Sequence, residues 1–313
     1  MSAQPGGLES IAGELLTVRD WLRWGVSRFN EAKLSYGHGT ANAIDEAAFL
    51  ILETLHLPID ALEPWLDCRL TDVERRAVHN ILVKRIDTRK PASYLTGTAY
   101  IQGHRFEVDE RVIVPRSFIG ELIAGGNLDE LVTDSDTRIL DLCTGSGCLA
   151  ILAALRFGQA SVDAVELSDD AIEVARQNIA CYEIGDRVTV LGGDLFKPVA
   201  GRRYDLIIAN PPYVAAAEVE SFPREYAAEP VMAHLGGADG LDLARRILAD
   251  AAAYLKPGGT LVMEIGTGRD ILDSEFHRLP FVWLDTEESA GEVLMIGQQD
   301  LQQVVTPRTP PKR

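Results

Sequence analysis

The 313-residue chain is poor in cysteine and has no long apolar run. Its four cysteines, Cys68, Cys143, Cys148 and Cys181, include no Cys-x-x-Cys pair, so neither a metal site nor a disulfide framework is predicted. No apolar stretch reaches the roughly 20 residues that a membrane helix needs. The N-terminus also lacks the basic start and apolar run of a secretory signal. These absences predict a protein that acts in the cytoplasm, away from membranes.

Basic residues are also scarce, with 30 Lys and Arg against 47 Asp and Glu and a net charge of -17. The excess lies in residues 116–313, which carry 31 acidic and 17 basic residues, whereas residues 1–90 carry 13 and 11. An acidic surface repels phosphate backbones and attracts basic partners. No basic stripe with interleaved aromatic residues is present. The composition disfavours direct contact with nucleic acid and favours a basic protein as partner.

The first ninety residues have helical periodicity in three segments. Apolar side chains recur at helical spacing within residues 15–26, 47–55 and 78–86. We therefore expect a helical domain over residues 1–90 that recognises the substrate. From residue 91 two short strand-like runs flank Gly103 and predict a β-hairpin linker over residues 91–115.

Residues 116–300 alternate between strand and helix patterns, which is typical of a parallel sheet covered on both faces. The predicted strands are Arg138–Leu142, Val162–Glu166, Val188–Leu191, Asp205–Ala209, Thr260–Ile265, Phe281–Asp285 and Val293–Ile296. The predicted helices are Cys148–Arg156, Ser168–Tyr182, Leu241–Leu255 and Asp270–Leu279. Residues 301–313 have no apolar periodicity and are expected to form a disordered tail.

A strand, a glycine turn and a helix follow one another from Ile139, with Gly145-Ser146-Gly147 at the turn. Glycine lets the backbone turn sharply and approach a ligand closely. Nineteen residues beyond Gly147, Glu166 ends the next strand, where a carboxylate can accept hydrogen bonds from both ribose hydroxyls. The pattern predicts a nucleotide-like ligand, although Gly145-x-Gly147-x-x-Ala150 also satisfies the dinucleotide fingerprint.

Asp141 distinguishes two classes of ligand. A dinucleotide would bring a doubly negative pyrophosphate to this turn, and a carboxylate at the end of the strand would repel it. S-adenosylmethionine has no phosphate and carries a positive sulfonium and a positive ammonium group, which a carboxylate attracts. The loop therefore favours S-adenosylmethionine over a dinucleotide or a turn that binds nothing.

The second motif is Asn210-Pro211-Pro212-Tyr213, directly after a predicted strand. The Asn210 side chain and the Pro211 backbone offer carbonyl oxygens as acceptors for a planar NH2 group, and Tyr213 can lie against its flat face. An amide nitrogen is a poor nucleophile because its lone pair is delocalised, and hydrogen bonds from both N–H groups return density to it. An isolated Pro-Pro would more simply close a strand, but here it follows the glycine loop in the expected order. The motif predicts a site that aims an amino or amide nitrogen.

Residues 85–300 resemble the protein-glutamine methyltransferases, a branch of the class I methyltransferases. Beyond the glycine loop, Glu166 and Asn210–Tyr213, the resemblance rests on Val114-Pro115-Arg116, Asp194-Leu195-Phe196, Glu229-Pro230, Gly236-Gly237-Ala238-Asp239-Gly240-Leu241 and Glu264-Ile265-Gly266. It implies a Rossmann-like α/β fold with a seven-stranded, mostly parallel sheet, an N-terminal helical bundle and a hairpin linker.

Within that family the chain looks like the branch that acts on the third protein of the large ribosomal subunit. Cys143 stands where the release-factor branch typically has glycine, and Trp24–Phe29 and Tyr36–Thr40 match the ribosomal branch. Phe118, where this branch usually has proline, and Met232–Leu235 depart from its pattern. The resemblance implies methylation of a glutamine side-chain amide in a free, basic ribosomal protein, with S-adenosylmethionine as methyl donor.

The resemblance also implies roles for individual residues. The expected cosubstrate-binding residues are Asp141, Cys143, Thr144, Gly145, Ser146, Gly147, Glu166, Asp194, Leu195 and Asn210. The expected substrate-binding residues are Asn210, Pro211, Pro212 and Tyr213, of which Asn210, Pro211 and Tyr213 are also expected to be catalytic. The alternatives are a release-factor glutamine methyltransferase, an adenine-amino methyltransferase of nucleic acid, and a silent assembly factor.

Overall fold

A computed structural model describes residues 13–132, 136–287 and 289–302. They divide into two compact units. The helical unit comprises the described residues up to Ala99 together with Phe222–Ala228, and the sheet unit comprises Tyr100–Ser221 and the described residues from Glu229 onward. The boundary at Ala99 falls inside the predicted linker, 91–115. The predicted disordered tail, 301–313, is wrong at Leu301, which ends a helix and is buried in the core, and residues 303–313 lie outside the described residues.

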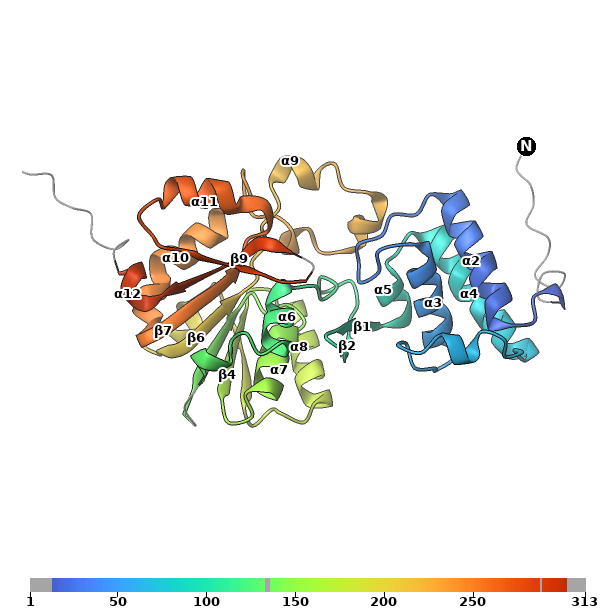
Figure 1. Cartoon of the computed structure of the whole chain (residues 1–313), viewed down its shortest axis with the longest axis horizontal. Helices are drawn as coiled ribbons and strands as arrows, with labels where there is room; N and C mark the ends of the chain where they lie inside the picture. The colour runs from blue at the N-terminus through green and yellow to red at the C-terminus, as the bar shows by residue number, and fades with distance from the viewer. Residues whose placement is uncertain (1–12, 133–135, 288, 303–313) are drawn as a thin grey trace, which may run out of the picture. The chain divides into compact units, whose positions relative to one another are not determined.

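The helical unit contains α2 (Val18–Ala32), α3 (Ala43–Thr54), α4 (Asp72–Thr88) and the short α5 (Ala92–Thr96) (Figure 1). Capping boxes at Thr17 and Thr71 satisfy the first backbone N–H groups of α2 and α4. The apolar faces of the helices meet in a shared core, which includes Trp21, Phe29, Leu50, Ile51 and Leu82. The predicted helical bundle is confirmed, whereas α5 was not predicted.

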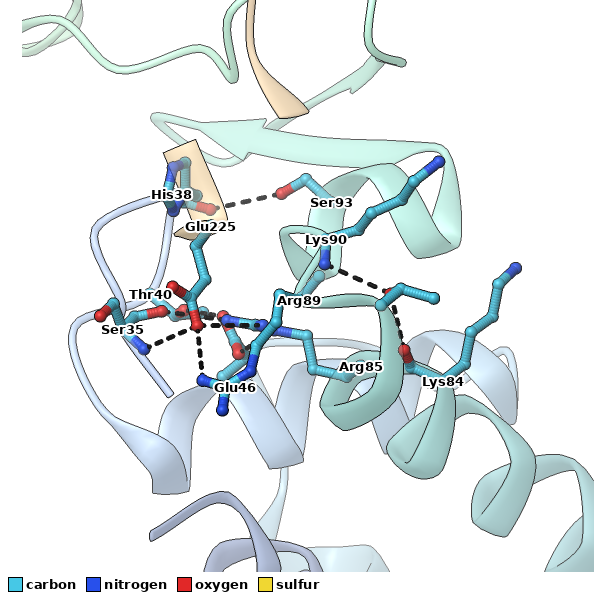
Figure 2. A network of polar contacts seen from close by, with 12 residues as sticks. Ser35, His38, Thr40, Glu46, Lys84, Arg85, Arg89, Lys90, Ser93 and Glu225 are labelled. Carbon is cyan, nitrogen blue, oxygen red and sulfur yellow. Dashed lines mark hydrogen bonds and ion pairs between the residues drawn. The ribbon is translucent and has the colours of Figure 1, made fainter. Parts of the chain in front are cut away.

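A buried ion network lies in the helical unit, as Figure 2 shows. Arg85, with no exposed side-chain surface, donates from Nε to Glu46 over 2.7 Å. Glu225, from the segment Phe222–Ala228, accepts from Arg89 over 3.0 Å and from the Ser35 backbone N–H over 3.1 Å. Buried charges are tolerated when they are paired and hydrogen-bonded. The network therefore anchors Phe222–Ala228 to the loop after α2 and to the end of α4.

The predicted hairpin is present as β1 (Thr98–Ile101) and β2 (His104–Glu107), which form a two-stranded sheet. Gln102 and Gly103 connect the two strands, and both have positive φ, 50° and 75°. This two-residue connection confirms the tight turn predicted at Gly103. Glycine adopts a positive φ at little cost in free energy.

The sheet unit is built on a seven-stranded sheet with the order β5-β4-β3-β6-β7-β9-β8. Its strands are β3 (Arg138–Leu142), β4 (Ser161–Glu166), β5 (Val188–Gly192), β6 (Tyr204–Ala209), β7 (Leu255–Glu264), β8 (Val282–Asp285) and β9 (Ala290–Gly297). The first five strands in that order pair in parallel, and β9 pairs antiparallel with both β7 and β8. The predicted fold class, a mostly parallel seven-stranded sheet, is confirmed.

Helices cover the sheet from both sides, with α6, α7 and α8 on one side and α10, α11 and α12 on the other (Figure 1). Their bounds are α6 (Phe118–Ala124), α7 (Cys148–Arg156), α8 (Asp169–Cys181), α9 (Ala216–Val219), α10 (Asp242–Tyr254), α11 (Arg269–Glu275) and α12 (Gln298–Leu301). Because both faces are covered, the central strands are buried almost throughout.

Register places the ends of the parallel strands together. Leu142, the last residue of β3, pairs with Val165 on one side and Ala209 on the other. Ala209 in turn pairs with Met263 of β7. Cys143, Glu166, Asn210 and Glu264 therefore follow or end neighbouring strands at one edge of the sheet, where α/β proteins bind their ligands.

Two sequence predictions need correction, and one helix was not predicted. The strand predicted over Thr260–Ile265 begins earlier, at Leu255, which was predicted as the end of a helix, and an irregularity in its pairing with β6 accommodates Gly258 and Gly259. Helix α11 ends at Glu275 rather than Leu279, because Phe276 leaves helical geometry. Helix α6 was not predicted, although Ser117 caps it by accepting from the Ile119 N–H. Among the described residues no helix is long and apolar enough to cross a membrane.

Candidate active site

A pocket with about 870 Å³ of empty space, open to solvent, lies in the sheet unit at the edge described above. Seven of the predicted site residues line it: Cys143, Gly145, Glu166, Asp194, Leu195, Asn210 and Pro212. The other predicted residues, Asp141, Thr144, Ser146, Gly147, Pro211 and Tyr213, lie next to these in the chain but do not line the pocket.

The glycine loop turns through three residues with positive φ: Cys143 at 61°, Gly145 at 56° and Gly147 at 82°. A Cβ built on Gly145 would meet nothing within 4 Å, so this glycine keeps space open on the pocket side. A Cβ on Gly147 would lie 3.3 Å from the Ala175 Cβ of α8, so this glycine lets the turn pack against that helix. The two glycines therefore have different roles, and only Gly145 faces the pocket.

Glu166, at the end of β4, is fixed by three backbone N–H groups. Its Oε2 accepts from Gly145 over 2.9 Å, and its Oε1 accepts from Leu167 over 2.8 Å and Ser168 over 3.0 Å. Three of the roughly four acceptor positions of the carboxylate are used, which leaves Oε2 able to accept one further hydrogen bond. Glu166 is thus a rigid acceptor on the pocket wall, directly joined to the glycine turn.

Asp141 is fully buried and lies beneath the loop. Its Oδ2 accepts from the Thr144 hydroxyl and from the Ala150 N–H at the start of α7, over 3.1 Å in the second case. Its Oδ1 is buried and has no hydrogen-bond partner within the described ranges. Burial raises the pKa of this carboxyl to about 7, and the two hydrogen bonds offset only part of the rise. The carboxylate therefore both shapes the turn and has an oxygen left to accept a bond.

Two further predicted residues complete this side of the pocket. Burial among carboxylates raises the pKa of the Cys143 thiol far above its ordinary value, so the thiol stays protonated and unreactive. Asp194 accepts hydrogen bonds from Lys197 and Arg246, each over 2.8 Å, and the bond from Lys197 contributes most to lowering its pKa. Both oxygens of Asp194 already accept from cations, which leaves this predicted cosubstrate-binding residue less able to bond to a ligand.

Asn210 follows β6 and lines the pocket. Its Nδ2 donates to the backbone carbonyl of Arg116 over 3.3 Å. Because the amide nitrogen is used in this bond, the side chain offers its Oδ1 as an acceptor. Arg116 is itself held by Glu229, which accepts from the Arg116 guanidinium over 2.9 Å and from the Val114 N–H over 3.0 Å.

Tyr213, three residues later, is oriented by its own partners. Its hydroxyl donates to Oε1 of Glu264, at the end of β7, over 3.0 Å. Its ring lies so close to Gly266 that a Cβ there would come within 2.7 Å of it. Burial raises the pKa of the Tyr213 hydroxyl, so it remains a hydrogen-bond donor.

The segment Gly236–Gly240 packs against the backbone of the Asn-Pro-Pro-Tyr motif. A Cβ on Gly236 would lie 2.7 Å from the Pro212 carbonyl oxygen, and one on Gly240 would lie 2.2 Å from that of Tyr213. The Val214 N–H also donates to His234 over 2.9 Å. These contacts give the glycine-rich motif a structural reason, since larger residues would displace the loop that carries Asn210.

Sequence reasoning missed part of the pocket wall. The additional lining residues are Arg111, Val112, Ile113, Val165, Leu167, Ser168, Ala171, Gly193, Pro230, Met232, Ala233, Leu235 and Leu243. Most are apolar and carry no chemical signature, so only the fold brings them together. Glu229-Pro230 and Met232–Leu235 had been noticed as motifs, but their sequence gave no reason to place them here. No group of three or more His, Cys, Asp or Glu suited to a metal ion occurs in the described part of the chain.

Comparisons with known proteins bear on the family and the fold. Residues 127–224 match the family model described as the methyltransferase small domain. A solved structure of the human Mettl16 catalytic domain in complex with an RNA hairpin aligns with a TM-score of 0.51 at 16% identity, over 86% of this chain and 95% of that one. At that identity the likeness concerns the fold alone.

Sequence relatives are much closer. The ribosomal protein uL3 glutamine methyltransferase of Bradyrhizobium diazoefficiens is 51% identical over 92% of this chain and 93% of its own length. The enzyme of the same name from Bordetella pertussis is 51% identical over 92% of this chain and 97% of its own. Such identity over nearly the whole length confirms the predicted family. The chain belongs to the ribosomal protein uL3 glutamine methyltransferases.

Proposed function

We propose that this protein transfers a methyl group from S-adenosylmethionine to the side-chain amide nitrogen of a glutamine in ribosomal protein uL3. The observation that carries the proposal is the orientation of Asn210. Its amide nitrogen is bonded to the Arg116 carbonyl, so its oxygen is offered as an acceptor on the wall of a pocket that also contains Glu166 and the glycine turn. The names of the relatives identify the kind of protein that carries the glutamine.

The residues present fit the methyl donor. Gly145 leaves open space on the pocket side, and much of the wall, including Leu167, Leu195 and Ile113, is apolar enough for an adenine ring. The buried carboxylate of Asp141, which does not line the pocket, would attract the positively charged methionine moiety from beneath the turn. Glu166 Oε2, which has one acceptor position free, would accept from a ribose hydroxyl. S-adenosylmethionine supplies an electrophilic methyl group on sulfur when it is bound.

The chain's own residues orient the nucleophile. We expect Asn210 Oδ1, on the pocket wall, to accept from one N–H group of the glutamine amide. The Pro211 carbonyl, next to it in the chain but outside that wall, would accept from the other, and the Tyr213 ring would limit the rotation of the amide. These bonds draw the lone pair back to nitrogen and aim it at the methyl carbon. The N–CH3 bond forms as the S–CH3 bond breaks, and the surplus proton leaves the nitrogen for water. No general base is required, because an alkylated, protonated amide is strongly acidic.

The partner belongs to the proposal as well. Ribosomal proteins are strongly basic, and the excess of acidic residues in 116–313 attracts such a chain. The target glutamine is reached in the free protein, in the cytoplasm, before assembly covers it with RNA. Direct binding of this enzyme to nucleic acid is not part of the mechanism.

Purified protein, uL3 and S-adenosylmethionine test the proposal directly. Mass spectrometry should find one added methyl group on a single uL3 glutamine, and none on release factors incubated in parallel. Methylated release factor with unmodified uL3 would overturn the substrate. Methylated RNA would overturn the reaction class.

Asn210→Ala tests whether Asn210 orients the substrate amide. It should lower kcat about a hundredfold or more, because it removes an orienting group that acts mainly in the transition state. S-adenosylmethionine affinity, measured by calorimetry, should change little. Glu166→Ala should show the reverse pattern, weakening cosubstrate binding by about 1–3 kcal/mol. Near-normal turnover of Asn210→Ala would refute the role assigned to it.

A further inference from the structure

Glu264 is a buried carboxylate that the proposed chemistry does not use. It is the last residue of β7 and is only 1% exposed. The pairing of Ala209 with Met263 places it beside Asn210 on the neighbouring strand. It does not line the pocket, and burial raises the pKa of its carboxyl. A buried acid next to the reacting groups needs a reason, because burial of a carboxylate is costly unless its oxygens are hydrogen-bonded.

The two oxygens of Glu264 bind different parts of the chain. Oε1 accepts from the Tyr213 hydroxyl over 3.0 Å. Oε2 accepts from the Ser117 hydroxyl over 2.6 Å and from the Phe118 N–H over 3.0 Å. One carboxylate therefore holds both the last residue of the Asn-Pro-Pro-Tyr motif and the segment at the start of α6.

That segment also controls the first residue of the motif. Asn210 Nδ2 donates to the carbonyl of Arg116, the residue just before Ser117. On the other side of this carbonyl, Glu229 holds the Val114 N–H and the Arg116 side chain. The carbonyl that orients Asn210 is thus fixed from both directions by buried carboxylates. Only Glu264, however, is bonded to Tyr213 as well.

We infer that Glu264 is a positioning residue for methyl transfer, which keeps Asn210 and Tyr213 in register by holding Tyr213 with one oxygen and the Ser117–Phe118 segment with the other. The inference rests on the proposed function and extends it. It explains why a carboxylate is needed: it can accept on two sides at once, whereas an amide has one acceptor oxygen. Small displacements of positioning groups are costly, since about 1 Å can reduce a rate by roughly a hundredfold.

Steady-state kinetics of Glu264→Gln and Glu264→Ala on uL3 test the inference. We expect kcat to fall about tenfold for Glu264→Gln and about a hundredfold for Glu264→Ala. S-adenosylmethionine affinity should stay within about twofold of wild type, because Glu264 lies outside the pocket wall. If Glu264→Ala does not fold, Glu264→Gln is still decisive. Wild-type kcat in Glu264→Gln, or weakened cosubstrate binding with unchanged kcat, would overturn the inference.

Asp163→Ala is the matched control for a purely structural effect. Asp163 is also a buried carboxylate that accepts from a tyrosine hydroxyl, that of Tyr204 over 2.7 Å, but it lies outside the pocket. Both alanine variants should lose thermal stability, and only Glu264→Ala should lose kcat. Equal loss of kcat in the two variants would mean that stability alone explains the effect.

A double-mutant cycle with Tyr213→Phe isolates the shared contact. Tyr213→Phe alone should cost about tenfold in kcat, and adding it to Glu264→Gln should cost less than about twofold more. Losses that multiply would show that the two residues act independently and would overturn the inference.

Crystal structures of the variants supply a readout that needs no substrate. The Tyr213 ring and the Asn210 amide should be displaced in Glu264→Ala and unmoved in Asp163→Ala. Unmoved side chains in Glu264→Ala would refute the positioning role. Failure of the wild type to methylate uL3 would instead refute the proposed function, and the crystallographic comparison would still decide the role of Glu264.

Discussion

Burial controls the ionisation of Asp141, the carboxylate beneath the glycine turn. Loss of hydration raises its pKa to about 7, so the negative charge that the sequence suggested is only partly present near neutral pH. A cation bound beside it would favour the ionised form. The affinity of the protein for a positively charged cosubstrate should therefore depend on pH.

We expect affinity for S-adenosylmethionine to rise about eightfold between pH 6 and pH 7.5, the change in ionised fraction of a group with a pKa of about 7. Calorimetry at the two pH values measures it. Asp141→Asn should bind more weakly and lose most of this rise. An equal rise in Asp141→Asn would show that another group is responsible.

The same shift has a consequence for stability. The folded pKa of Asp141 lies above its ordinary value, so its favourable contribution is complete below about pH 4 and is lost as pH rises through about 7. Asp141→Asn, which is neutral throughout, should therefore raise the free energy of unfolding at pH 8 by about 1 kcal/mol or more. Urea unfolding should show no such gain at pH 4. Destabilisation at pH 8 would contradict the assignment of a buried charge.

Cysteine reactivity reports on the pocket at the same scale. Cys68 and Cys181 are exposed, whereas burial raises the thiol pKa of Cys143 and raises that of Cys148 to about 12. Because the thiolate is the reactive form, an alkylating reagent at pH 8 should modify Cys68 and Cys181 and leave the other two unmodified. Peptide mapping after a short exposure measures this. Labelling of Cys143 as fast as Cys68 would contradict the raised pKa of its thiol.

At the scale of elements, the segment Phe222–Ala228 is held in the helical unit by Glu225. Glu225→Ala would leave the buried Arg85 and the partly exposed Arg89 with fewer partners, and it should lower the stability of the helical unit by roughly 3 kcal/mol. Thermal unfolding followed by circular dichroism measures the loss. Asp67→Ala, which removes an exposed ion pair with Arg19, is the control and should leave the melting temperature unchanged. Similar melting temperatures for the two variants would contradict the anchoring role.

Most elements could be predicted because their signals are local. Each strand of the sheet combines a short apolar run with flanking turn residues, and α7 was predicted with the bounds that the structure has, Cys148–Arg156. Helix α6 was missed because Phe118–Ala124 is only seven residues long and was treated as a motif for comparison. The pairing of Leu255 with Tyr204 was missed because it depends on a strand about fifty residues away.

The candidate site was predictable to a similar degree. The glycine turn and the Asn-Pro-Pro-Tyr motif are each a continuous stretch of sequence, so each can be recognised on its own. The parallel pairing of β3 with β4 then brings Glu166 beside the glycine turn. The contacts of Glu264 with Ser117, and of Glu229 with Val114, join residues more than a hundred positions apart. Periodicity and spacing contain no information about such pairs, so only the fold reveals that carboxylates orient the motif. The roles assigned to the site residues stay predictions until ligands are bound.

At the scale of the whole molecule, the net charge of -17 should govern the encounter with a basic substrate. Long-range attraction is screened by salt, with a Debye length of about 10 Å at 0.1 M. Raising sodium chloride from about 50 to 300 mM should lower kcat/KM for uL3 about tenfold and change S-adenosylmethionine affinity less than twofold. Initial-rate assays at each salt concentration measure how kcat/KM depends on salt. A salt-independent kcat/KM would contradict electrostatic recruitment.

The central claim is that Asn210 presents its amide oxygen to the nitrogen of a substrate glutamine. A crystal structure of the protein with S-adenosylhomocysteine and a uL3 peptide that includes the target glutamine tests it most directly. We expect the glutamine Nε2 within hydrogen-bond distance of Asn210 Oδ1, facing the sulfur atom, with Asn210 Nδ2 still bonded to the Arg116 carbonyl. A glutamine bound elsewhere, or an Asn210 side chain turned away from the sulfur, would contradict the account.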